Sequence, residues 1–294
     1  MMLVTVMIWG MNFVAVKLVL REFSPLAFTG LRFTMATLVM WLFLWQRQRT
    51  RAPGSGESMT VARRDWPLII GVGLLGHTLY QLLFVHGMAR TTAANSSLLL
   101  ATAPIWVAVL GYLLHIERIS RVTWYGILLS FCGIIVLILG GGGRVDLGGA
   151  TTRGDLLLLA CAIVWAVHTT ASKPLLARYS PLKLTSWAML AGTIPLAIIS
   201  IPAVRQQNWA AITPVGWIAF LFSTLLSVVV GYLVWYTSVQ RVGNARTAVY
   251  SNLTPVFAII FAWIILDSTL MPLQLVGGAV VLAGLILTRR GRGR

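Results

Sequence analysis

One apolar segment carries a face of polar and aromatic side chains that could bind a small molecule. His77, Tyr80, Gln81 and Phe84 recur at i, i+3, i+4 and i+7, so a helix would place all four on one face. Polar side chains inside a long apolar helix point toward other helices or toward a cavity. The pattern therefore indicates either hydrogen bonds and packing between helices, or the wall of a site that binds its ligand through rings and hydrogen bonds.

Residues of the same kinds recur in the second half of the chain. At a spacing of 151 residues Phe84 corresponds to Trp235, and at a spacing of 156 residues Trp9 corresponds to Trp165. Because matched positions in both halves are aromatic, we expect one substrate site shared by the halves. Its candidate residues are Trp9, Asn12, His77, Tyr80, Gln81, Phe84, Trp165, His168, Tyr232 and Trp235, followed by Asn95, Leu99, Tyr250 and Asn252.

These residues do not form a catalytic or metal-binding pattern. Hydrolysis inside a membrane needs an activated nucleophile or a set of metal ligands, and neither His77 nor His168 has the HExxH spacing. The literal GxGxxG match at 71–76 lies in an apolar helix rather than after a strand, so it favours close helix packing over a nucleotide site. We expect no enzyme activity, no cofactor and no metal.

Composition places the chain in a membrane. Of its 294 residues 58% are hydrophobic and only 10% are charged, with a mean hydropathy of +0.85, whereas soluble domains carry about 25% charged residues. Runs of roughly 20 apolar residues cross a bilayer as helices, because a helix satisfies its own backbone polar groups. We predict an all-α membrane protein with ten spans, at about 2–20, 26–45, 67–88, 93–114, 123–140, 154–176, 182–202, 213–238, 245–266 and 270–288.

The basic residues predict the orientation of these spans. They give a net charge of +16, but they lie in short clusters between apolar runs, which is not the stripe of a nucleic-acid-binding face. Sixteen Lys and Arg residues fall on one side of the predicted spans and five on the other. Basic loops stay in the cytoplasm. We therefore expect a bacterial-type inner-membrane protein with both termini cytoplasmic.

The chain also repeats itself. FSPLAFT at 23–29 returns as YSPLKLT at 179–185, and ordered matches continue over most of the chain, which indicates duplication. Five spans in each half is an odd number, so the second half would enter the membrane upside down. Such a 5+5 inverted-topology repeat is typical of carriers. The predicted units are a first repeat at 1–140, a Gly-rich external linker at 141–153 and a second repeat at 154–294.

Several motifs together resemble the EamA domain of the drug/metabolite transporter superfamily. In order, they are WGxNF from Trp9 with Lys17 after it, SPL from Ser24, LRF from Leu31, Pro104, the pair Glu117-Arg118, and Gly126-x6-Gly133. The resemblance implies ten helices with cytoplasmic termini, and a family that includes exporters of amino acids and other small metabolites. The second half departs from the pattern, since His168 replaces Asn12 and Ala188 replaces Arg32, so roles are not mirrored automatically.

Four further residues could gate the protein. Lys17 and Arg32 fall near the outer membrane boundary, where they would snorkel to the headgroups, pair with Glu22 as an outer gate, or capture a substrate carboxylate. Pro104 and Pro255 fall at equivalent places within spans, where proline would make either a fixed bend or a hinge.

The function expected from these features is export of small amphipathic metabolites, amino acids foremost and aromatic ones among them, by alternating access. A monomer should suffice, with the bilayer and a small-molecule substrate as its only partners. The absence of a carboxylate deep in any span favours facilitated transport over proton antiport through a histidine. A proton-coupled drug or metabolite antiporter, a flippase for lipid-linked substrates and a membrane scaffold remain as alternatives.

Overall fold

The computed structural model describes residues 1–49, 60–88, 90, 99–115, 119–140, 152–266 and 271–290. Within these ranges all regular secondary structure is helical. Five helical stretches are long and apolar enough to cross a membrane, namely Pro25–Arg49, Arg63–Met88, Thr152–Leu176, Pro181–Gln206 and Pro214–Val242. Met2–Val16, Ala103–Leu113, Arg121–Val136 and Pro272–Thr288 are shorter apolar helices. The all-α membrane class is therefore confirmed, and the count of ten spans stays a prediction.

The helices of the first half are α1 (Met2–Val19), α2 (Pro25–Arg49), η1 (Arg63–Asp65), α3 (Trp66–Gly73), η2 (Leu74–Leu79), α4 (Tyr80–Met88), α6 (Ala103–Leu113) and α7 (Arg121–Gly140). Those of the second half are α8 (Thr152–Leu176), α9 (Pro181–Gln206), η4 (Trp209–Ala211), α10 (Pro214–Leu221), η5 (Phe222–Val230), α11 (Gly231–Val242), α12 (Asn244–Val249), η6 (Tyr250–Leu253), α13 (Thr254–Leu266) and α14 (Pro272–Arg290). Most of the predicted linker, 141–151, lies outside the described residues.

Local sequence explains where several helices begin and end. The hydroxyls of Ser180 and Thr213 accept hydrogen bonds from the backbone N–H groups of Lys183 and Gly216, and a proline follows each cap directly. This is the combination that favours a helix start, because the cap satisfies a free N–H and proline lacks one. Helix α11 ends at Gly243, whose φ of 91° is accessible to glycine and costly for other residues.

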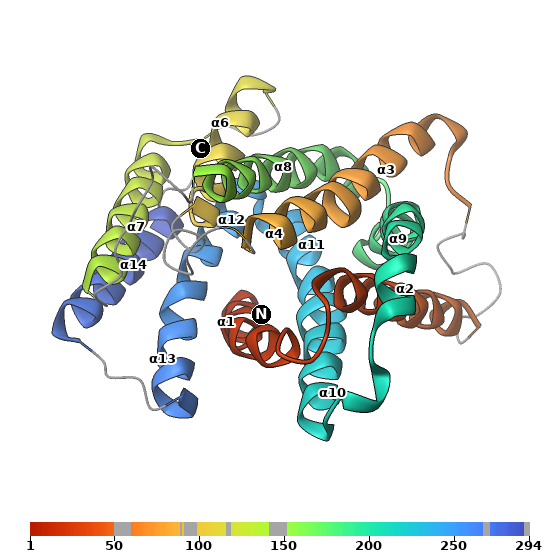
Figure 1. Ribbon diagram of the computed structural model, residues 1–294. Coiled ribbons are helices and arrows are strands. Elements are labelled where there is room, and N and C mark those ends of the chain that lie inside the picture. The colour runs from red at the N-terminus through yellow and green to blue at the C-terminus, as the bar shows by residue number, and fades with distance from the viewer. Residues whose placement is uncertain are drawn as a thin grey trace.

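Helices of the two halves pack against each other throughout the bundle. Contacts join α2 to α9, α1 to α13, α4 to α8 and α7 to α14, and Figure 1 shows α7 and α14 side by side at the edge of the molecule. Glycines make the last contact close. A Cβ atom on Gly126 would come within 2.7 Å of the carbonyl oxygen of Gly284, and one on Gly133 within 2.6 Å of the backbone nitrogen of Val281. Only glycine lets the two backbones approach this closely.

Residues at matched positions in the two halves contact each other at two places. The hydroxyls of Thr37 and Thr193, 156 residues apart, are hydrogen-bonded at 2.8 Å. The Ser130 hydroxyl donates to the carbonyl oxygen of Val281, 151 residues further on, at 3.2 Å. These are the two spacings of the sequence repeat. Residues that correspond in the sequence repeat are therefore in direct contact at these two places in the fold.

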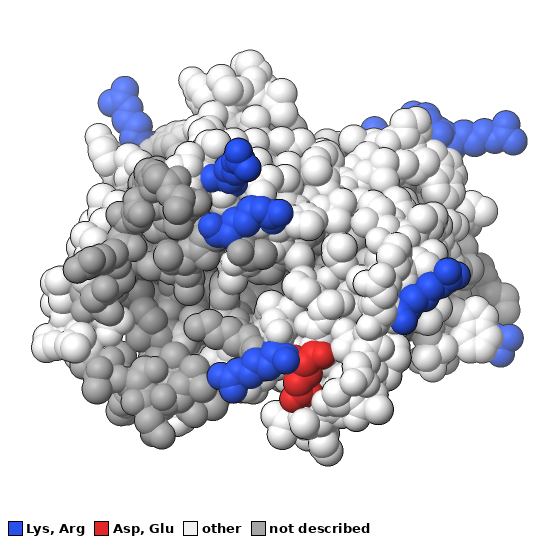
Figure 2. Space-filling model, viewed as in Figure 1, with Lys and Arg blue, Asp and Glu red and all other residues white. Residues whose placement is uncertain are grey.

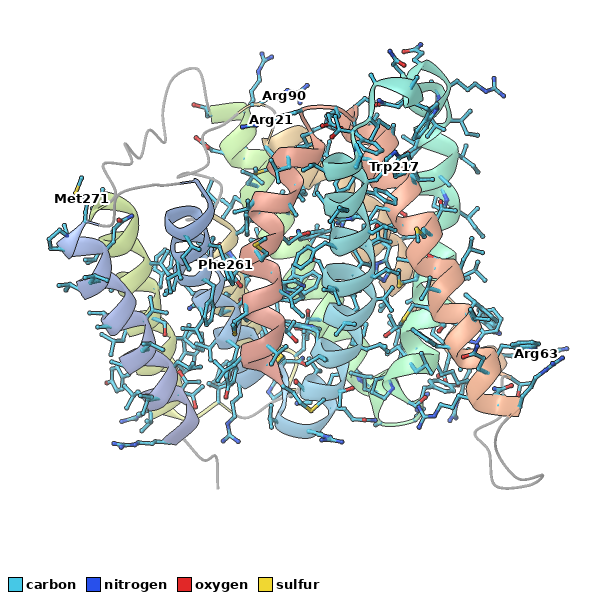
Figure 3. The ribbon with its side chains drawn as sticks, turned by 90° about the horizontal axis from the view of Figure 1, so that it is seen from below. Arg21, Arg63, Arg90, Trp217, Phe261 and Met271 are labelled. Atoms are coloured by element: carbon cyan, nitrogen blue, oxygen red, sulfur yellow. The ribbon has the colours of Figure 1, made fainter. Side chains whose placement is uncertain are left out.

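Charged residues lie at both ends of the bundle. Figure 3 shows the helices side-on, with Arg21 and Arg90 at one end and Arg63 at the other. We call these the Arg21 end and the Arg63 end. Figure 2 shows an end face that is mostly uncharged, with basic side chains scattered over it and one acidic patch.

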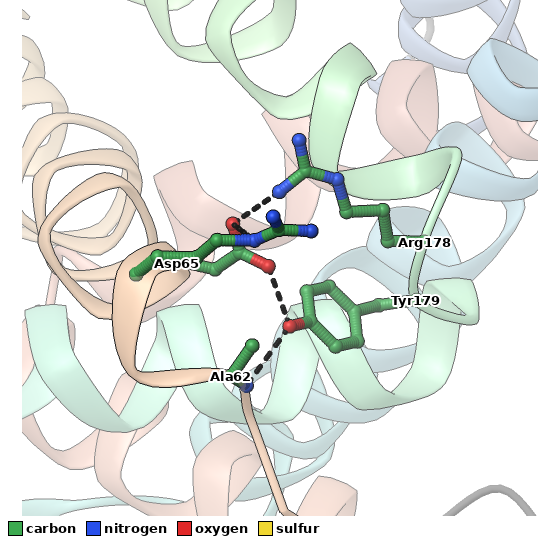
Figure 4. A network of polar contacts seen from close by, with 5 residues as sticks. Ala62, Asp65, Arg178 and Tyr179 are labelled. Carbon is green, nitrogen blue, oxygen red and sulfur yellow. Dashed lines mark hydrogen bonds and ion pairs between the residues drawn. The ribbon is translucent and has the colours of Figure 1, made fainter.

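A polar network at the Arg63 end ties the two halves together (Figure 4). Asp65 is buried and accepts hydrogen bonds from Arg178 and from the Tyr179 hydroxyl, the latter at 2.7 Å. The Tyr179 hydroxyl in turn accepts from the backbone N–H of Ala62 at 3.1 Å. Burial and the hydrogen bond to Asp65 raise the pKa of Tyr179, so this hydroxyl keeps its proton. We call this network the Asp65 clasp.

A second network joins the halves at the Arg21 end. The Glu22 carboxylate accepts hydrogen bonds from the backbone N–H and the hydroxyl of Thr213, both at 2.8 Å, and so caps the start of α10. Gln207 donates to the Glu22 carbonyl oxygen and accepts from the Ser24 N–H. We call this network the Glu22 clasp. At a spacing of 151 residues Thr213 is the counterpart of Ala62, so the two clasps use equivalent backbone N–H groups.

Candidate functional site

Three tryptophans from both halves meet at the centre of the bundle. Trp9 comes from α1, Trp165 from α8 and Trp235 from α11, each well inside its helical stretch. The ring centroids are 5.5 Å apart for Trp9 and Trp235, 5.2 Å for Trp165 and Trp235, and 6.3 Å for Trp9 and Trp165. These separations allow mutually favourable ring contacts. The prediction that matched aromatic positions lie together is thus correct for these three residues.

Two tyrosines extend this aromatic cluster toward the polar face seen in the sequence. The Trp165 ring centroid lies 5.3 Å from that of Tyr80 and 5.8 Å from that of Tyr232. Tyr80 stacks on Phe84 at 6.1 Å, as expected for residues one turn apart on α4. Gln81, which is buried on the same helix, corresponds in the repeat to Tyr232, whose ring lies in this cluster. The helix face predicted from spacing therefore points into the bundle.

Both halves carry a π-helical segment beside this cluster. The periodicity of the sequence did not predict either segment. The segment η2 runs over 74–79, and its counterpart at a spacing of 151 residues, 225–230, lies within η5. A π segment inserts an extra residue into a helical turn and is frequent at functional sites. The carbonyl oxygen of Ser227 in η5 accepts a hydrogen bond from Trp9 Nε1 at 3.0 Å, and that of Val72, just before η2, accepts from His168.

His168 connects two neighbouring helices through hydrogen bonds at both of its ring nitrogens. Its Nδ1 lies 2.9 Å from the Val72 carbonyl oxygen, which can only accept, so Nδ1 carries the proton. Its Nε2 then accepts from the Tyr236 hydroxyl at 2.8 Å. The ring is 0% exposed and packs over Gly76, where a Cβ atom would lie 2.8 Å from Nε2. Both ring nitrogens are occupied, so His168 has no free polar group to offer a substrate.

His77 differs sharply from His168. It is also 0% exposed, but within the described part of the chain neither of its ring nitrogens has a hydrogen-bond partner. Its ring centroid lies 4.9 Å from that of Tyr232 and 5.8 Å from that of Phe33. Buried polar groups are normally satisfied, and exceptions call for a functional explanation. His77 is therefore a polar group that is free to bind a ligand.

Arg32 is buried rather than snorkelling, which corrects one expectation from the sequence. It is 8% exposed, and its guanidinium lies over the rings of Phe28 and Phe33, at 5.0 and 5.2 Å from their centroids. Its Nη1 donates to the Ser223 hydroxyl at 3.0 Å. The alternative of an ion pair with Glu22 is not realised either, because the Glu22 carboxylate is bound to Thr213. Arg32 faces the interior because Ser223 and the two rings form its surroundings.

Other predicted residues are placed less centrally. Asn12 lies on α1 one turn beyond Trp9, and its Oδ1 has no partner among the described residues, as is also true of Trp235 Nε1. Asn252 is buried in η6 with an equally unpartnered side chain, but η6 packs against α1, α13 and α14, and Tyr250 makes no ring contact with the cluster in the part of the chain described. Leu99 is half-buried before α6. Asn95 and the Lys17 side chain fall outside the described residues.

The two prolines do not bend the middle of a helix, contrary to the prediction. Pro104 lies in the first turn of α6, after a turn at Ala101 and Thr102. Pro255 is the second residue of α13, directly after the tighter 3-10 turn η6. Proline is well tolerated in a first turn, where its missing N–H would have no partner. Both spans are thus interrupted just before the proline, and any flexing would occur at that interruption.

Long apolar helices around a buried cluster of rings and unpartnered polar groups are the architecture of a multi-pass membrane protein. The model of the EamA-like transporter family matches this chain twice, over residues 1–139 and 152–290. The chain therefore belongs to the EamA-like transporter family, and the resemblance seen in its motifs is confirmed.

Several relatives agree with this assignment. An uncharacterized transporter of Archaeoglobus fulgidus is 30% identical over 97% of this chain and 94% of its own length. A probable terminal-alkyne amino-acid exporter of Streptantibioticus cattleyicolor is 29% identical over 98% of this chain and 92% of its own. A probable amino-acid metabolite efflux pump of Salmonella typhimurium is 28% identical over 97% and 92%. A crystal structure superposes with a TM-score of 0.81 at 20% identity, covering 99% of this chain and 97% of that one, which supports the fold.

Proposed function

We propose that this protein exports small amphipathic metabolites, amino acids foremost, across a bacterial inner membrane by alternating access. The observation that carries the proposal is the central cluster, in which Trp9, Trp165 and Trp235 offer ring faces while His77 and Arg32 offer unpartnered polar groups. An apolar pocket with a few polar groups suits a substrate that has an apolar body and a polar head. Two relatives with amino-acid export in their names point to the same substrate class.

The transport mechanism we propose rests on two inverted repeats, at 1–140 and 154–294, with five spans each. The equivalent-residue contact of Thr37 with Thr193, the two equivalent clasps and the two family matches support this division. An inverted pair can open to either side when its halves exchange shapes. Close packing of α7 on α14 joins the halves within one chain, so a monomer suffices.

Counterflow of labelled amino acids into proteoliposomes tests the export function. Vesicles loaded with an unlabelled amino-acid mixture should accumulate labelled aromatic and branched-chain amino acids, and vesicles without protein should not. Failure of every amino acid to exchange, with correctly folded protein, would refute the proposed substrate class.

The orientation is tested separately. We propose that both termini and the 46–66 loop are cytoplasmic, because sixteen basic residues lie on that side. Cysteines introduced at 50–59 in intact cells should resist an impermeant thiol reagent, and cysteines at 141–151 should react. Labelling of the first loop from outside would contradict the inverted arrangement.

The energy source is the main point on which the alternatives differ. We favour facilitated transport, because His168 is held by two hydrogen bonds and the described helices contain no carboxylate at mid-span. Proton antiport through His77 is the second candidate, since its ring nitrogens are free. Uptake of a zwitterionic amino acid with and without an imposed pH gradient separates the two. Accumulation above equilibrium that follows the gradient and disappears in His77→Gln would establish antiport.

A further inference from the structure

Arg32 carries a buried charge that the described protein does not neutralise. Three acidic residues are described, and each is elsewhere: Glu22 is bound to Thr213, Asp65 to Arg178 and Tyr179, and Asp155 lies in the first turn of α8. Within the described ranges none of them forms an ion pair with Arg32. Its Nε has no partner there either, and only Nη1 is bonded, to a neutral hydroxyl. An unpaired buried cation is costly to a fold.

The packing of the fold does not need a cation at this position. The residue equivalent to Arg32 in the second repeat is Ala188, which is fully buried on α9. Ala188 lies against Gly73, where its backbone carbonyl carbon would be 3.1 Å from an added Cβ atom. The same helix position is thus occupied by a small apolar residue in one half and by arginine in the other. An intramembrane arginine kept in one half alone points to a ligand rather than to packing.

The surroundings of Arg32 connect it to the aromatic cluster. Its guanidinium lies 5.2 Å from the centroid of the Phe33 ring, and that centroid lies 5.8 Å from the centroid of the His77 ring. Tyr232 contacts His77 at 4.9 Å between centroids and Trp165 at 5.8 Å. A path of neighbouring side chains therefore runs from Arg32 through Phe33, His77 and Tyr232 to the tryptophans. The bundle seen side-on in Figure 3 places Arg21, eleven positions before Arg32 in the chain, at one end, with α2 running from there toward the other end.

We infer that Arg32 binds the carboxylate of the transported molecule, which makes the substrates monocarboxylates with an apolar body. This inference rests on the transport function proposed above. Guanidinium nitrogens match a carboxylate in pairs, and the free Nε edge of Arg32 supplies such a pair. One carboxylate neutralises one guanidinium, whereas a phosphate would leave excess negative charge among apolar rings. The apolar body then lies against Trp165 and Trp235, and an ammonium group, where present, against their ring faces.

Ligand pairs that differ only in the carboxylate provide the first test. Purified full-length protein in detergent is titrated with phenylacetate and with its neutral isostere phenylacetamide, and binding is measured by thermal stabilisation. We expect phenylacetate to bind about tenfold or more tightly than the amide. Equal binding, or no binding of phenylacetate, would overturn the inference. Repeating the titration with phosphatidylglycerol present tests a lipid headgroup as the anion, and loss of the preference there would overturn it as well.

Variants of Arg32 provide the second test. Arg32→Gln should lower phenylacetate affinity to that of phenylacetamide while leaving the amide unchanged, and Arg32→Lys should restore part of the preference because it keeps the charge without the planar fork. The matched control is Arg21→Gln, which removes one exposed positive charge near the same end of α2 and should change neither affinity. A purely structural role would lower both affinities together, and that result would contradict the inference.

Binding and transport failures are distinguishable. A carboxylate preference in detergent without any counterflow in vesicles would refute the export function and leave the Arg32 site standing. Counterflow that continues with equal rates for carboxylates and amides would refute the Arg32 site and leave the transporter standing.

Discussion

Two histidines at the same depth of the bundle have opposite environments, and this difference predicts their roles. His168 bonds Val72 and Tyr236, while His77 bonds nothing in the described part of the protein. His168→Gln should therefore lower the free energy of unfolding by about 1–3 kcal/mol, because buried partners lose their bonds. His77→Gln should leave it unchanged. Thermal unfolding in detergent measures both, and an equal Tm loss in the two variants would contradict the assignment of roles.

The aromatic cluster should determine substrate affinity residue by residue. Trp165→Ala removes a ring that contacts Trp9, Tyr80 and Trp235, and contacts of this kind are worth roughly 1–3 kcal/mol. We expect the half-saturating concentration in counterflow to rise about tenfold or more. Trp45→Ala is the matched control, because Trp45 is 44% exposed near the end of α2. An unchanged half-saturating concentration in well-folded Trp165→Ala would exclude this residue from the site.

At the scale of helices, glycines show which contacts the packing depends on. Gly71 has open space around it, whereas Gly126 is pressed against Gly284 and Thr288 of α14. Gly71→Ala should be neutral or stabilise the protein by up to about 1 kcal/mol, since alanine favours helix more than glycine does. Gly126→Ala should destabilise it by about 1–3 kcal/mol, because the helices must separate to admit the methyl group. Thermal unfolding compares the two, and equal effects would argue against close α7–α14 packing.

Irregular turns also matter at the scale of helices. They are the helix breaks before Pro104 and Pro255 and the π segments η2 and η5. All of them occur at matched positions of the two halves and interrupt the regular hydrogen-bond ladder, and the two π segments do so beside the central cluster. Periodicity predicted where these helices lie. It could not predict the irregular turns, because the same residues satisfy an ordinary α-helical pattern and only contacts with neighbouring helices select the wider or tighter turn.

At the scale of the whole molecule, the two clasps should set which end opens. The Asp65 clasp holds the halves together at the Arg63 end, and the Glu22 clasp holds them at the Arg21 end. Asp65→Asn weakens the first through loss of the charged bond to Arg178, so access from the Arg63 end should increase. Glu22→Gln should increase access from the Arg21 end. Opposite shifts in the labelling of cysteines placed near Trp165 are the expected result.

An exposed charge beside the Asp65 clasp provides the control for this prediction. Arg64→Gln alters a neighbouring exposed charge whose nitrogen is 4.0 Å from Asp65, and it should leave accessibility nearly unchanged. Accessibility that moves in the same direction in Asp65→Asn and Glu22→Gln would show that the clasps stabilise the bundle generally rather than governing its two ends.

The sequence alone was sufficient to predict the membrane class and the family, because apolar run length and motifs are properties of the chain itself. It also predicted the meeting of Trp9, Trp165 and Trp235, since helical spacing and the repeat relate these positions. It could not separate His77 from His168, because hydrogen-bond partners come from distant helices. It left three alternatives open for Arg32, namely snorkelling to the headgroups, a pair with Glu22 and capture of a substrate carboxylate, because sequence position gives the depth of a side chain but not the direction in which it points. Only the packing of α2 against η5 and α9 directs the Arg32 side chain into the bundle. The tertiary structure therefore decides that a cation belongs to the proposed site.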